Sequence, residues 1–466
     1  AKKKGAGKVI RLFKHYVPQR LLLQMLFDAG LILLVIIGVS ITLIDLPGKS
    51  VSLASHHALS LAACLFIINS AAGFYQQAHT RTWLQSCVRA AVAAMVALPL
   101  PFLLFRALPS GIDDEAMAFA AMLAIVVVIA HRVYAAHAEN RSSMRTRLLV
   151  VGSGTAAELV GRTLKTAAPL VDVVGYFADP NDPLCVPRSE LLSTQNSLTA
   201  TAIKLQVNEI VVALNDRRGG SMPLKELLAC RVNGIRVFDI STHFEKTLGQ
   251  IRLDFVNAGW LIFGDGFDQG IVRTTFKRLF DILCATALIA LSAPLMLLTA
   301  LLVAVESRGP ILYRQERVGL NGSTFKVIKF RSMYNDAEKD GKPRWATAKD
   351  TRITWIGNII RRSRIDELPQ LFNVLAGTMS IVGPRPERPY FVEQLTAQIP
   401  YYGVRQSVKP GITGWAQVRY HYGSTVEDSQ EKLQYDLYYV KNNTLFLDAL
   451  ILFETVAVVL TGKGAR

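Results

Sequence analysis

The chain has 466 residues, 51% of them hydrophobic, which is enough for two or three domains and too apolar for a wholly soluble protein. Its 52 Lys and Arg against 36 Asp and Glu give a net charge of +16. That charge suits nucleic acid, anionic lipid headgroups or phosphorylated substrates without choosing among them. Five cysteines without CxxC spacing predict neither a disulfide framework nor a zinc site.

Four apolar stretches lie in the N-terminal part of the chain, near 21–43, 58–75, 87–108 and 116–136. Each has close to the ~20 residues that cross a bilayer core. Lysine and arginine concentrate before the first stretch, between the second and third, and after the fourth, which places both ends of the bundle in the cytoplasm. We therefore predict that residues 1–140 form a basic arm and four transmembrane helices. No small-residue cleavage site follows the first stretch, so we expect this anchor to be retained.

One acid, Asp28, lies inside the first apolar stretch. Because a charge in lipid is costly, this residue is a candidate for an intramembrane functional site. The favoured interpretation is plainer: either a polar contact between helices, or a side chain that reaches the membrane boundary.

A fifth apolar run, 281–306, has basic residues on both flanks, with Lys277 and Arg278 before it and arginines after it. A simple span would export the arginine-rich last third of the chain, against the usual charge rule. Ser292 and Pro294 lie at its midpoint, where proline removes an amide donor and bends a helix. We predict a helix-break-helix that enters one leaflet and returns. A kinked true span is the alternative.

Between these membrane segments, residues 145–265 have the pattern of a Rossmann-like domain. Strand candidates at 147–151, 171–179, 209–214 and 234–240 are separated by helical lengths, which predicts a small parallel α/β fold.

Gly152, Gly154 and Ala157 follow the first of these strands and open a helix-like pattern. Glycines in this context let backbone amides approach a phosphate at the helix N-terminus. Asp179 follows at the spacing of a ribose-binding acid. The residues predict a candidate nucleotide site. Close packing of a helix on a strand explains the same pattern, and a regulatory or oligomerising role stays open.

The last third of the chain is strongly basic. Residues 311–333 read as two strands around a turn at Gly319 to Gly322. Five basic side chains of this segment are predicted to line a polar face: Arg314, Arg317, Lys326, Lys329 and Arg331.

Two acids, Asp366 and Glu367, stand between two short helical patterns, with Pro369 and Gly377 marking the second helix. Nearby arginines are expected to keep both carboxylates ionised, and an ionised carboxylate can ligate magnesium or attack phosphorus. The arginines would then neutralise charge on the transferring group. This pattern predicts phosphoryl transfer through an aspartyl intermediate near the membrane plane. The alternatives are a helix N-cap at Asp366, which Pro369 disfavours because it has no N–H, and an exposed first-turn acid at Glu367.

Six stretches carry a family resemblance: KRLFDI at 277–282, RQERVG, KFRSM, RIDELPQLFNVLAGTMSIVGPRPE, KPGITGWAQV and the closing DLYYVKNNTLFLDALILFETVAVVLTGKGAR. In this order they resemble the catalytic domain of the bacterial polyprenyl-phosphate sugar-phosphate transferases, the monotopic phosphoglycosyltransferases, over residues 273–466. The N-terminal spans and the middle domain are similar to the long-form members, which initiate exopolysaccharide and capsule synthesis. The resemblance therefore covers nearly the whole chain.

The resemblance implies a reaction. Asp366 would attack the β-phosphate of a UDP-sugar, with glucose 1-phosphate as the expected group, and release UMP. Undecaprenyl phosphate would then take the sugar phosphate. Glu367, together with Asp366, would hold Mg²⁺ or Mn²⁺.

The resemblance also assigns further residues to the site. Phosphate contacts are expected from Lys329, Arg331, Arg385 and Arg314. Glu387 would be a polar partner, and Trp415 and Gln417 would shape the nucleotide pocket, unless they belong to a turn pinned by a packed tryptophan. The family often has a short turn where this chain has Arg419-Tyr420-His421, which leaves the sugar open.

The expected partners are a UDP-sugar, undecaprenyl phosphate and inner-membrane lipids, with no nucleic acid. The expected assembly is a homo-oligomer, a dimer or higher. The protein is expected in the bacterial inner membrane as a multi-pass protein, with its active site on the cytoplasmic side and the apolar tail 444–461 packed or lying along the surface. The rival hypotheses are a catalytically inactive, nucleotide-sensing scaffold for polysaccharide assembly and a solute transporter. A transporter would need more spans than the chain offers.

Overall fold

The computed structural model describes residues 9–12, 15–43, 114–138, 146–168, 171–179, 182–193, 196–214, 222–256, 270–334, 350–420, 423 and 425–461. The chain divides into two compact units. The first comprises residues 1–12 and 16–249, and the second comprises 13–15 and 250–466.

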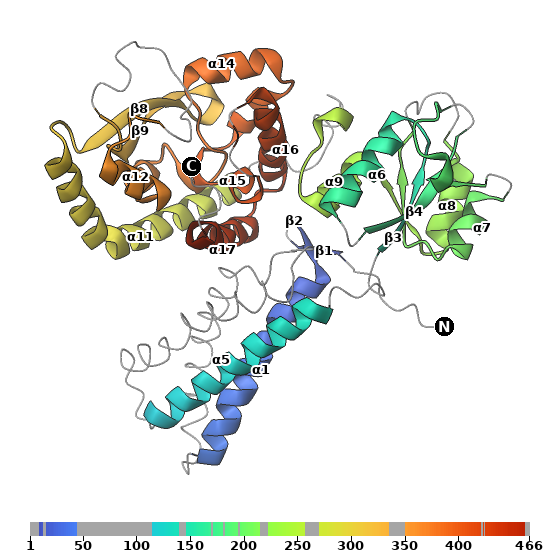
Figure 1. Ribbon diagram of the computed structural model, residues 1–466, viewed down its shortest axis with the longest axis horizontal. Helices are drawn as coiled ribbons and strands as arrows, with labels where there is room; N and C mark the ends of the chain where they lie inside the picture. Colours follow the sequence, from blue (N-terminus) through green and yellow to red (C-terminus); the bar gives the residue numbers. More distant parts are fainter. Residues whose placement is uncertain are drawn as a thin grey trace. The chain divides into compact units, whose positions relative to one another are not determined.

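Two long apolar helices, α1 (Gln19–Leu43) and α5 (Asp114–Ala138), follow a small pair of strands, β1 (Val9–Leu12) and β2 (His15–Pro18). The two helices lie side by side (Figure 1). They match the predicted stretches 21–43 and 116–136 as helices. The predicted stretches 58–75 and 87–108 lie outside the described residues, so the four-helix bundle stays a prediction.

Asp28 of α1 is buried, and its Oδ1 lies 3.3 Å from Nδ1 of His131 on α5. The His131 ring also packs on Phe27, with 4.6 Å between the ring centroids. Asp28 therefore takes part in an interhelix polar contact, which is the plainer of the two interpretations of this residue.

The middle of the chain forms an α/β fold. Its elements are β3 (Thr146–Val151), α6 (Thr155–Ala167), β4 (Val171–Phe177), η2 (Arg188–Glu190), β5 (Leu191–Leu192), α7 (Leu198–Lys204), β6 (Glu209–Val212), α8 (Leu224–Val232), β7 (Arg236–Asp239) and α9 (Ile240–Leu248). The five strands are all parallel, in the order β5-β4-β3-β6-β7. The central strands β3 and β6 are almost entirely buried apolar residues, as expected for a parallel sheet covered on both faces. The predicted parallel α/β fold is confirmed.

The second unit begins earlier than the predicted domain boundary. Ile251 and Val256 pack in its hydrophobic core, and the backbone N–H of Ile251 donates to the carbonyl of Gln434 at 3.0 Å. A short 3-10 turn, η3 (Leu253–Phe255), lies between them. Residues 250–256 therefore belong to the C-terminal unit and not to the α/β fold predicted for 145–265.

The C-terminal unit is α+β. Its elements are α11 (Ile271–Glu306), β8 (Leu312–Val318), η4 (Leu320–Gly322), β9 (Thr324–Phe330), α12 (Trp355–Arg362), η5 (Ile365–Glu367), α13 (Gln370–Ala376), β10 (Ser380–Val382), α14 (Pro389–Gln398), η6 (Tyr402–Ser407), β11 (Gly411–Thr413), α15 (Trp415–Arg419), α16 (Val426–Asn442) and α17 (Leu445–Thr461). β8 and β9 form the predicted antiparallel hairpin. Leu447 and Ile451 of α17 are fully buried, so this helix packs on the domain core.

Helix α11 is a single helix of 36 residues with Pro294 inside it. Figure 1 shows it as two limbs that meet at an angle. The predicted helix-break-helix is thus present as one bent helix without a gap between its limbs, because a proline removes one amide donor and bends a helix without ending it. Of the helices in the described ranges, α11 is the one long and apolar enough to cross a membrane. The re-entrant course stays a prediction.

Candidate active site

The two acids lie in a one-turn 3-10 helix, η5, between α12 and α13. Arg364 precedes them in the left-handed conformation, with φ +61° and ψ +14°, which a non-glycine residue adopts at a cost. This residue reverses the chain after α12, and both Asp366 and Glu367 are buried. Pro369 is the N-cap of α13. The N-cap interpretation of Asp366 is therefore excluded.

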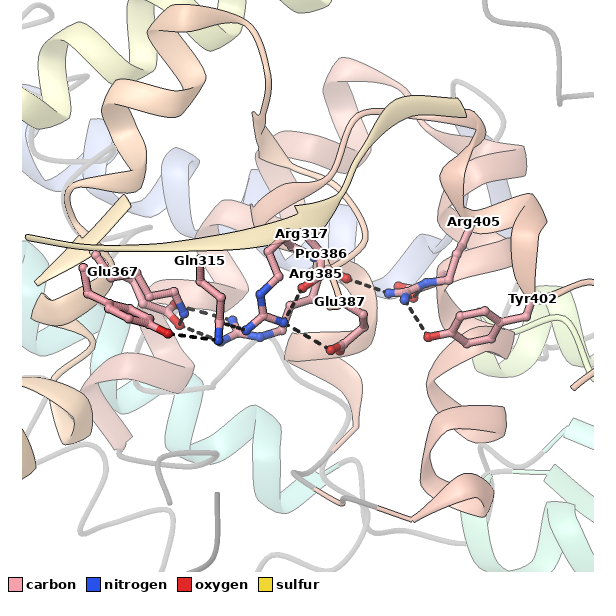
Figure 2. Close-up of polar contacts among 11 residues, drawn as sticks. Gln315, Arg317, Glu367, Arg385, Pro386, Glu387, Tyr402 and Arg405 are labelled. Carbon is pink, nitrogen blue, oxygen red and sulfur yellow. Dashed lines mark hydrogen bonds and ion pairs between the residues drawn. The ribbon is translucent and has the colours of Figure 1, made fainter. Parts of the chain in front are cut away.

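Glu367 is held by a group of cations (Figure 2). Arg385 grips its carboxylate with both guanidinium NH₂ groups, at 2.6 Å from Oε1 and 3.5 Å from Oε2. The Lys329 ammonium and an Arg364 Nη1 lie 3.4 Å and 3.7 Å from Oε1. Burial alone would raise the pKa of Glu367, but the charges of Arg385 and Lys329 outweigh it and hold the pKa well below its usual range.

Asp366 has the opposite environment. It is 8% exposed, and within the described part of the chain its carboxylate accepts no hydrogen bond and forms no ion pair. Burial and the negative charge of Glu367 raise the pKa of Asp366 to about 6, against the opposing charges of Lys329 and Arg361. The cations therefore favour the ionised form of Glu367 as expected, whereas at Asp366 burial and the charge of Glu367 outweigh them. Asp366 is still mostly ionised at neutral pH, and among the described residues it has no partner that would compete with a ligand.

Burial also shifts the pKa of Lys329. Desolvation lowers the pKa of its ammonium group, while Glu367 opposes that shift. A phosphate beside the ammonium would favour its charged form, as Glu367 does.

The basic residues of the hairpin do not share one face. Cross-strand partners in an antiparallel pair lie on the same face. The register pairs Lys329 with Tyr313, and Arg317, four residues further along β8, lies on that same face. Arg314 pairs with Ile328, so Arg314 and Lys326 lie on the opposite face from Lys329. The predicted common polar face is therefore wrong, and Arg314 is exposed away from the acids.

Arg331 lies just past the end of β9 and is 6% exposed. Its Nη2 donates to the carbonyl oxygens of Val303 and Ser307, at 3.2 Å and 2.6 Å, and Nη1 donates to the carbonyl of Arg308 at 3.3 Å. The guanidinium therefore caps the C-terminal end of α11, where carbonyl oxygens lack helical partners. The structure does not bring this predicted phosphate ligand to Glu367.

The sequence places Arg317 on the predicted polar face but gives it no role in the site, and the structure sets it beside Pro386 and Glu387. Its Nη1 donates to the Pro386 carbonyl at 3.1 Å and to Glu387 Oε2 at 3.4 Å, and its Nη2 donates to Gln315 Oε1 at 2.6 Å (Figure 2). Glu387 is thus a polar partner of Arg317. Strand alternation puts Gln315, Arg317 and Lys329 on one face of the hairpin, and this pattern could have indicated the role of Arg317 from the sequence.

Trp415 is 2% exposed and stacks on Tyr438, with 5.9 Å between the ring centroids. The Arg419 guanidinium lies 4.2 Å from the centroid of the indole ring. Gln417 donates from Nε2 to the Ile412 carbonyl at 3.2 Å. The packed tryptophan, the alternative to a nucleotide pocket, is the arrangement that the structure has.

In the glycine fingerprint of the α/β fold, groups that could face a phosphate instead contact other residues of the chain. Gly152 has φ +126° and lies against the backbone of Ala213, and Gly154 is the N-cap of α6. The Ser153 amide, of the kind that a phosphate would bind, donates to Asp182 Oδ2 at 3.3 Å. Ala157 is fully buried.

Asp179 lies two residues past the end of β4, and its carbonyl accepts from the Asp182 amide at 3.1 Å. It therefore stands at the base of the loop that carries Asp182. Nucleotide binding by this domain stays a prediction.

The acid pair fits a divalent cation of the magnesium type. No group of three or more His, Cys, Asp or Glu suited to a metal occurs in the part of the chain that the structure describes. Mg²⁺ commonly takes only one or two protein carboxylates and completes its shell with water and substrate phosphates. Asp366 offers a carboxylate that has no hydrogen-bond or ion-pair partner among the described residues, and Glu367 is its neighbour in the same turn.

The candidate site is therefore a buried acid pair, with cations gathered on Glu367, in a domain that carries a long apolar helix. The model of the bacterial sugar transferase family matches residues 272–462. The chain belongs to this family.

Three curated relatives illustrate the similarity. UDP-N-acetylgalactosamine-undecaprenyl-phosphate N-acetylgalactosaminephosphotransferase of Aeromonas hydrophila is 43% identical over 52% of this chain and 56% of its own. UDP-glucose:undecaprenyl-phosphate glucose-1-phosphate transferase of Xanthomonas campestris pv. campestris is 45% identical over 63% of this chain and 62% of its own. Exopolysaccharide production protein PSS of Rhizobium leguminosarum bv. phaseoli is 42% identical over 40% of this chain and 97% of its own. The chain spans about half the length of the first two.

Proposed function

We propose that this protein transfers a hexose 1-phosphate from a UDP-sugar to undecaprenyl phosphate through a covalent intermediate on Asp366. One observation carries the proposal: Asp366 is a buried carboxylate without a partner in the described chain, beside a second carboxylate that cations already neutralise. Relatives named for phosphotransfer to undecaprenyl phosphate, with glucose or N-acetylgalactosamine as the sugar, support the substrate class. Glucose 1-phosphate is the group we propose first.

In the first step an Asp366 carboxylate oxygen forms a bond to the β-phosphorus of the UDP-sugar. The bond from that phosphorus to the oxygen bridging the two phosphates breaks, and UMP leaves with the bridging oxygen. In the second step a phosphate oxygen of undecaprenyl phosphate attacks the same phosphorus and releases the Asp366 carboxylate. The product is undecaprenyl diphosphate sugar. Lys329 and Arg385, which lie at the acid pair, would neutralise charge on the transferring phosphoryl oxygens.

Asp366 and Glu367 are the residues that would hold Mg²⁺ or Mn²⁺. The bound cation would supply neutralisation of the diphosphate charge. Glu367 would have to exchange part of its contact with Arg385 for the ion, and the freed guanidinium would then be available to a phosphate.

The exposed side chains of α11 support a place in the inner membrane. Its large apolar residues Leu291, Leu297, Leu301 and Val305 are 61% to 81% exposed, and an exposed apolar surface of this extent needs lipid or another apolar partner. We propose a multi-pass inner-membrane protein with its active site on the cytoplasmic side. Its partners would be the lipid acceptor, the UDP-sugar and the surrounding lipids, and it would assemble as a homo-oligomer that initiates exopolysaccharide or capsule synthesis.

The test is UMP release by the purified full chain from a panel of UDP-sugars, with undecaprenyl phosphate and Mg²⁺. We expect Asp366→Asn to lower the rate by on the order of 10³-fold or more, as removal of a nucleophile does in other enzymes. Asp182→Asn, in the α/β fold, is the matched control and should retain the native rate.

Mass spectrometry of the native chain, quenched after UDP-sugar without acceptor lipid, should show a phosphosugar on the peptide that contains Asp366. An inactive scaffold would release no UMP in either form. UMP release at the native rate by Asp366→Asn would refute the covalent route.

A further inference from the structure

Arg385 is the cation closest to Glu367, and its own position depends on a second arginine behind it. Arg405, on η6, donates from Nη2 to the backbone carbonyl of Arg385 at 2.8 Å. Figure 2 shows Arg405 reaching this carbonyl, while the Arg385 guanidinium extends toward Glu367. The contact fixes the backbone from which the Arg385 side chain leaves.

Arg405 is itself held firmly. Its Nε and Nη2 lie 2.9 Å and 2.8 Å from Asp436 Oδ2 on α16, and its Nη1 donates to the Tyr402 hydroxyl at 2.9 Å. Arg405, Asp436 and Tyr402 are all nearly fully buried, at 9%, 2% and 3% exposure. A buried ion pair is costly to desolvate and adds little net stability to the fold. Here the pair fixes positions, because the planar guanidinium of Arg405 joins three partners at once.

From these contacts we infer that Arg405 is a positioning residue for the transfer reaction, acting through the Arg385 backbone to hold the Arg385 guanidinium at Glu367. The order of contacts is Asp436 to Arg405, Arg405 to the Arg385 carbonyl, and the Arg385 side chain to Glu367. Arg405 touches neither carboxylate of the acid pair in these contacts. This inference rests on the proposed function.

Three segments distant in sequence meet in this network. Asp436 lies 31 residues after Arg405, and Arg405 lies 20 residues after Arg385. Tyr401 precedes η6 in the left-handed conformation, with φ +62°, and directs the chain so that Tyr402 turns into the core. Strain of this kind persists where the surrounding structure fixes it, and it occurs often at functional sites.

The variant Arg405→Lys tests the inference. Lysine keeps a positive charge for the buried Asp436, but a single ammonium cannot reproduce the fork that reaches Asp436 and the Arg385 carbonyl together. We expect kcat/KM for UMP release to fall on the order of 10- to 100-fold, because a displacement of about 1 Å at a reacting group costs that much. Tyr402→Phe, which leaves the bonds to Asp436 and Arg385 in place, is the matched control and should stay within about 3-fold of the native rate.

A purely structural role for Arg405 predicts different results. If Arg405 acts through Arg385, Arg405→Lys should have no further effect on kcat/KM in an Arg385→Ala background. Equal losses in both backgrounds would overturn the inference.

Thermal unfolding of each variant shows whether it is folded. The native chain in the same assay separates the two proposals. If native protein releases no UMP, the proposed function fails; if native protein is active and Arg405→Lys matches Tyr402→Phe, only the positioning role fails.

Discussion

The two units of this chain each carry an aspartate at a place where a phosphate could bind, and the two aspartates have opposite environments. In the α/β fold, Asp182 accepts a hydrogen bond from the Ser153 amide of the glycine fingerprint. In the C-terminal unit, Asp366 is buried without a partner in the described chain, and the cations gather on Glu367. The Ser153 amide thus has an acceptor within the chain, whereas the Asp366 carboxylate has no partner among the described residues. The comparison separates a polar group that the fold itself satisfies from one that it does not.

Of the variants that test this difference, Arg385→Ala is expected to lower kcat/KM for UMP release the most. The change removes the shortest cation contact of Glu367, 2.6 Å to Oε1, and one positive charge from beside the acid pair, where we propose that phosphate binds. We expect kcat/KM for UMP release to fall by on the order of 10²- to 10³-fold, as for other donors that stabilise developing charge.

Arg362→Ala, at an exposed position of α12, is the matched control and should stay near the native rate. Equal activity of the two variants would show that the Arg385 contact is structural. It would also remove the reason for placing substrate phosphate at this end of the acid pair.

The pH dependence of the reaction tests the state of Asp366. Attack needs the ionised carboxylate, and burial with the charge of Glu367 raises the pKa of Asp366 to about 6. The kcat/KM for UMP release should therefore fall about tenfold per pH unit below pH 6 and stay level above it until other groups titrate. Initial rates between pH 4.5 and 8 measure this limb. A limb near pH 4, the range of an ordinary aspartate, would show that the environment of Asp366 in solution is more polar than the structure has it.

Several short elements of the site could be predicted from the sequence, because turn residues and strand alternation next to each element mark it. The hairpin at 311–333 follows from alternating strand residues around a glycine turn, and the short helices on either side of Asp366 follow from Pro369 and Gly377. The contacts of Glu367 with Arg364 and Arg385, which lie 3 and 18 residues away, could also be expected from their proximity in the chain. Each of these depends on residues within about twenty positions of one another.

The parts that could not be predicted depend on packing between distant segments. Arg331 and Lys329 stand two positions apart on or near one strand, yet one caps α11 and the other meets Glu367. Arg405 has no local signal, since its partners lie 20 and 31 residues away. The bend in α11 could be predicted from Pro294, but a proline does not tell whether the helix continues beyond the bend.

The free energy of unfolding gives a second test of the difference between Asp366 and Asp182. The folded pKa of Asp366, about 6, lies above the ordinary value of 3.8. Between pH 4 and 6 the folded state therefore holds a proton that the unfolded state has lost, so the free energy of unfolding decreases as pH rises through this window. Above pH 6 the folded chain carries the full free-energy cost of keeping the Asp366 carboxylate buried and charged. Asp366→Asn removes the charge and should stabilise the C-terminal unit at pH 7.5 by about 1 to 3 kcal/mol.

Asp182→Ala should act in the opposite direction. The variant leaves the Ser153 amide, in a residue that is 1% exposed, without its acceptor, and a lost partner for a buried N–H costs about 1 to 3 kcal/mol. Hydrogen–deuterium exchange of the full chain, followed separately for peptides around β3 and around α13, measures both changes in one protein. Slower exchange in Asp366→Asn and faster exchange in Asp182→Ala would confirm that one carboxylate is held for a ligand and the other for the fold. Faster exchange in both variants would mean that Asp366, too, stabilises the chain, and a carboxylate that the fold itself needs is a poor candidate for a nucleophile.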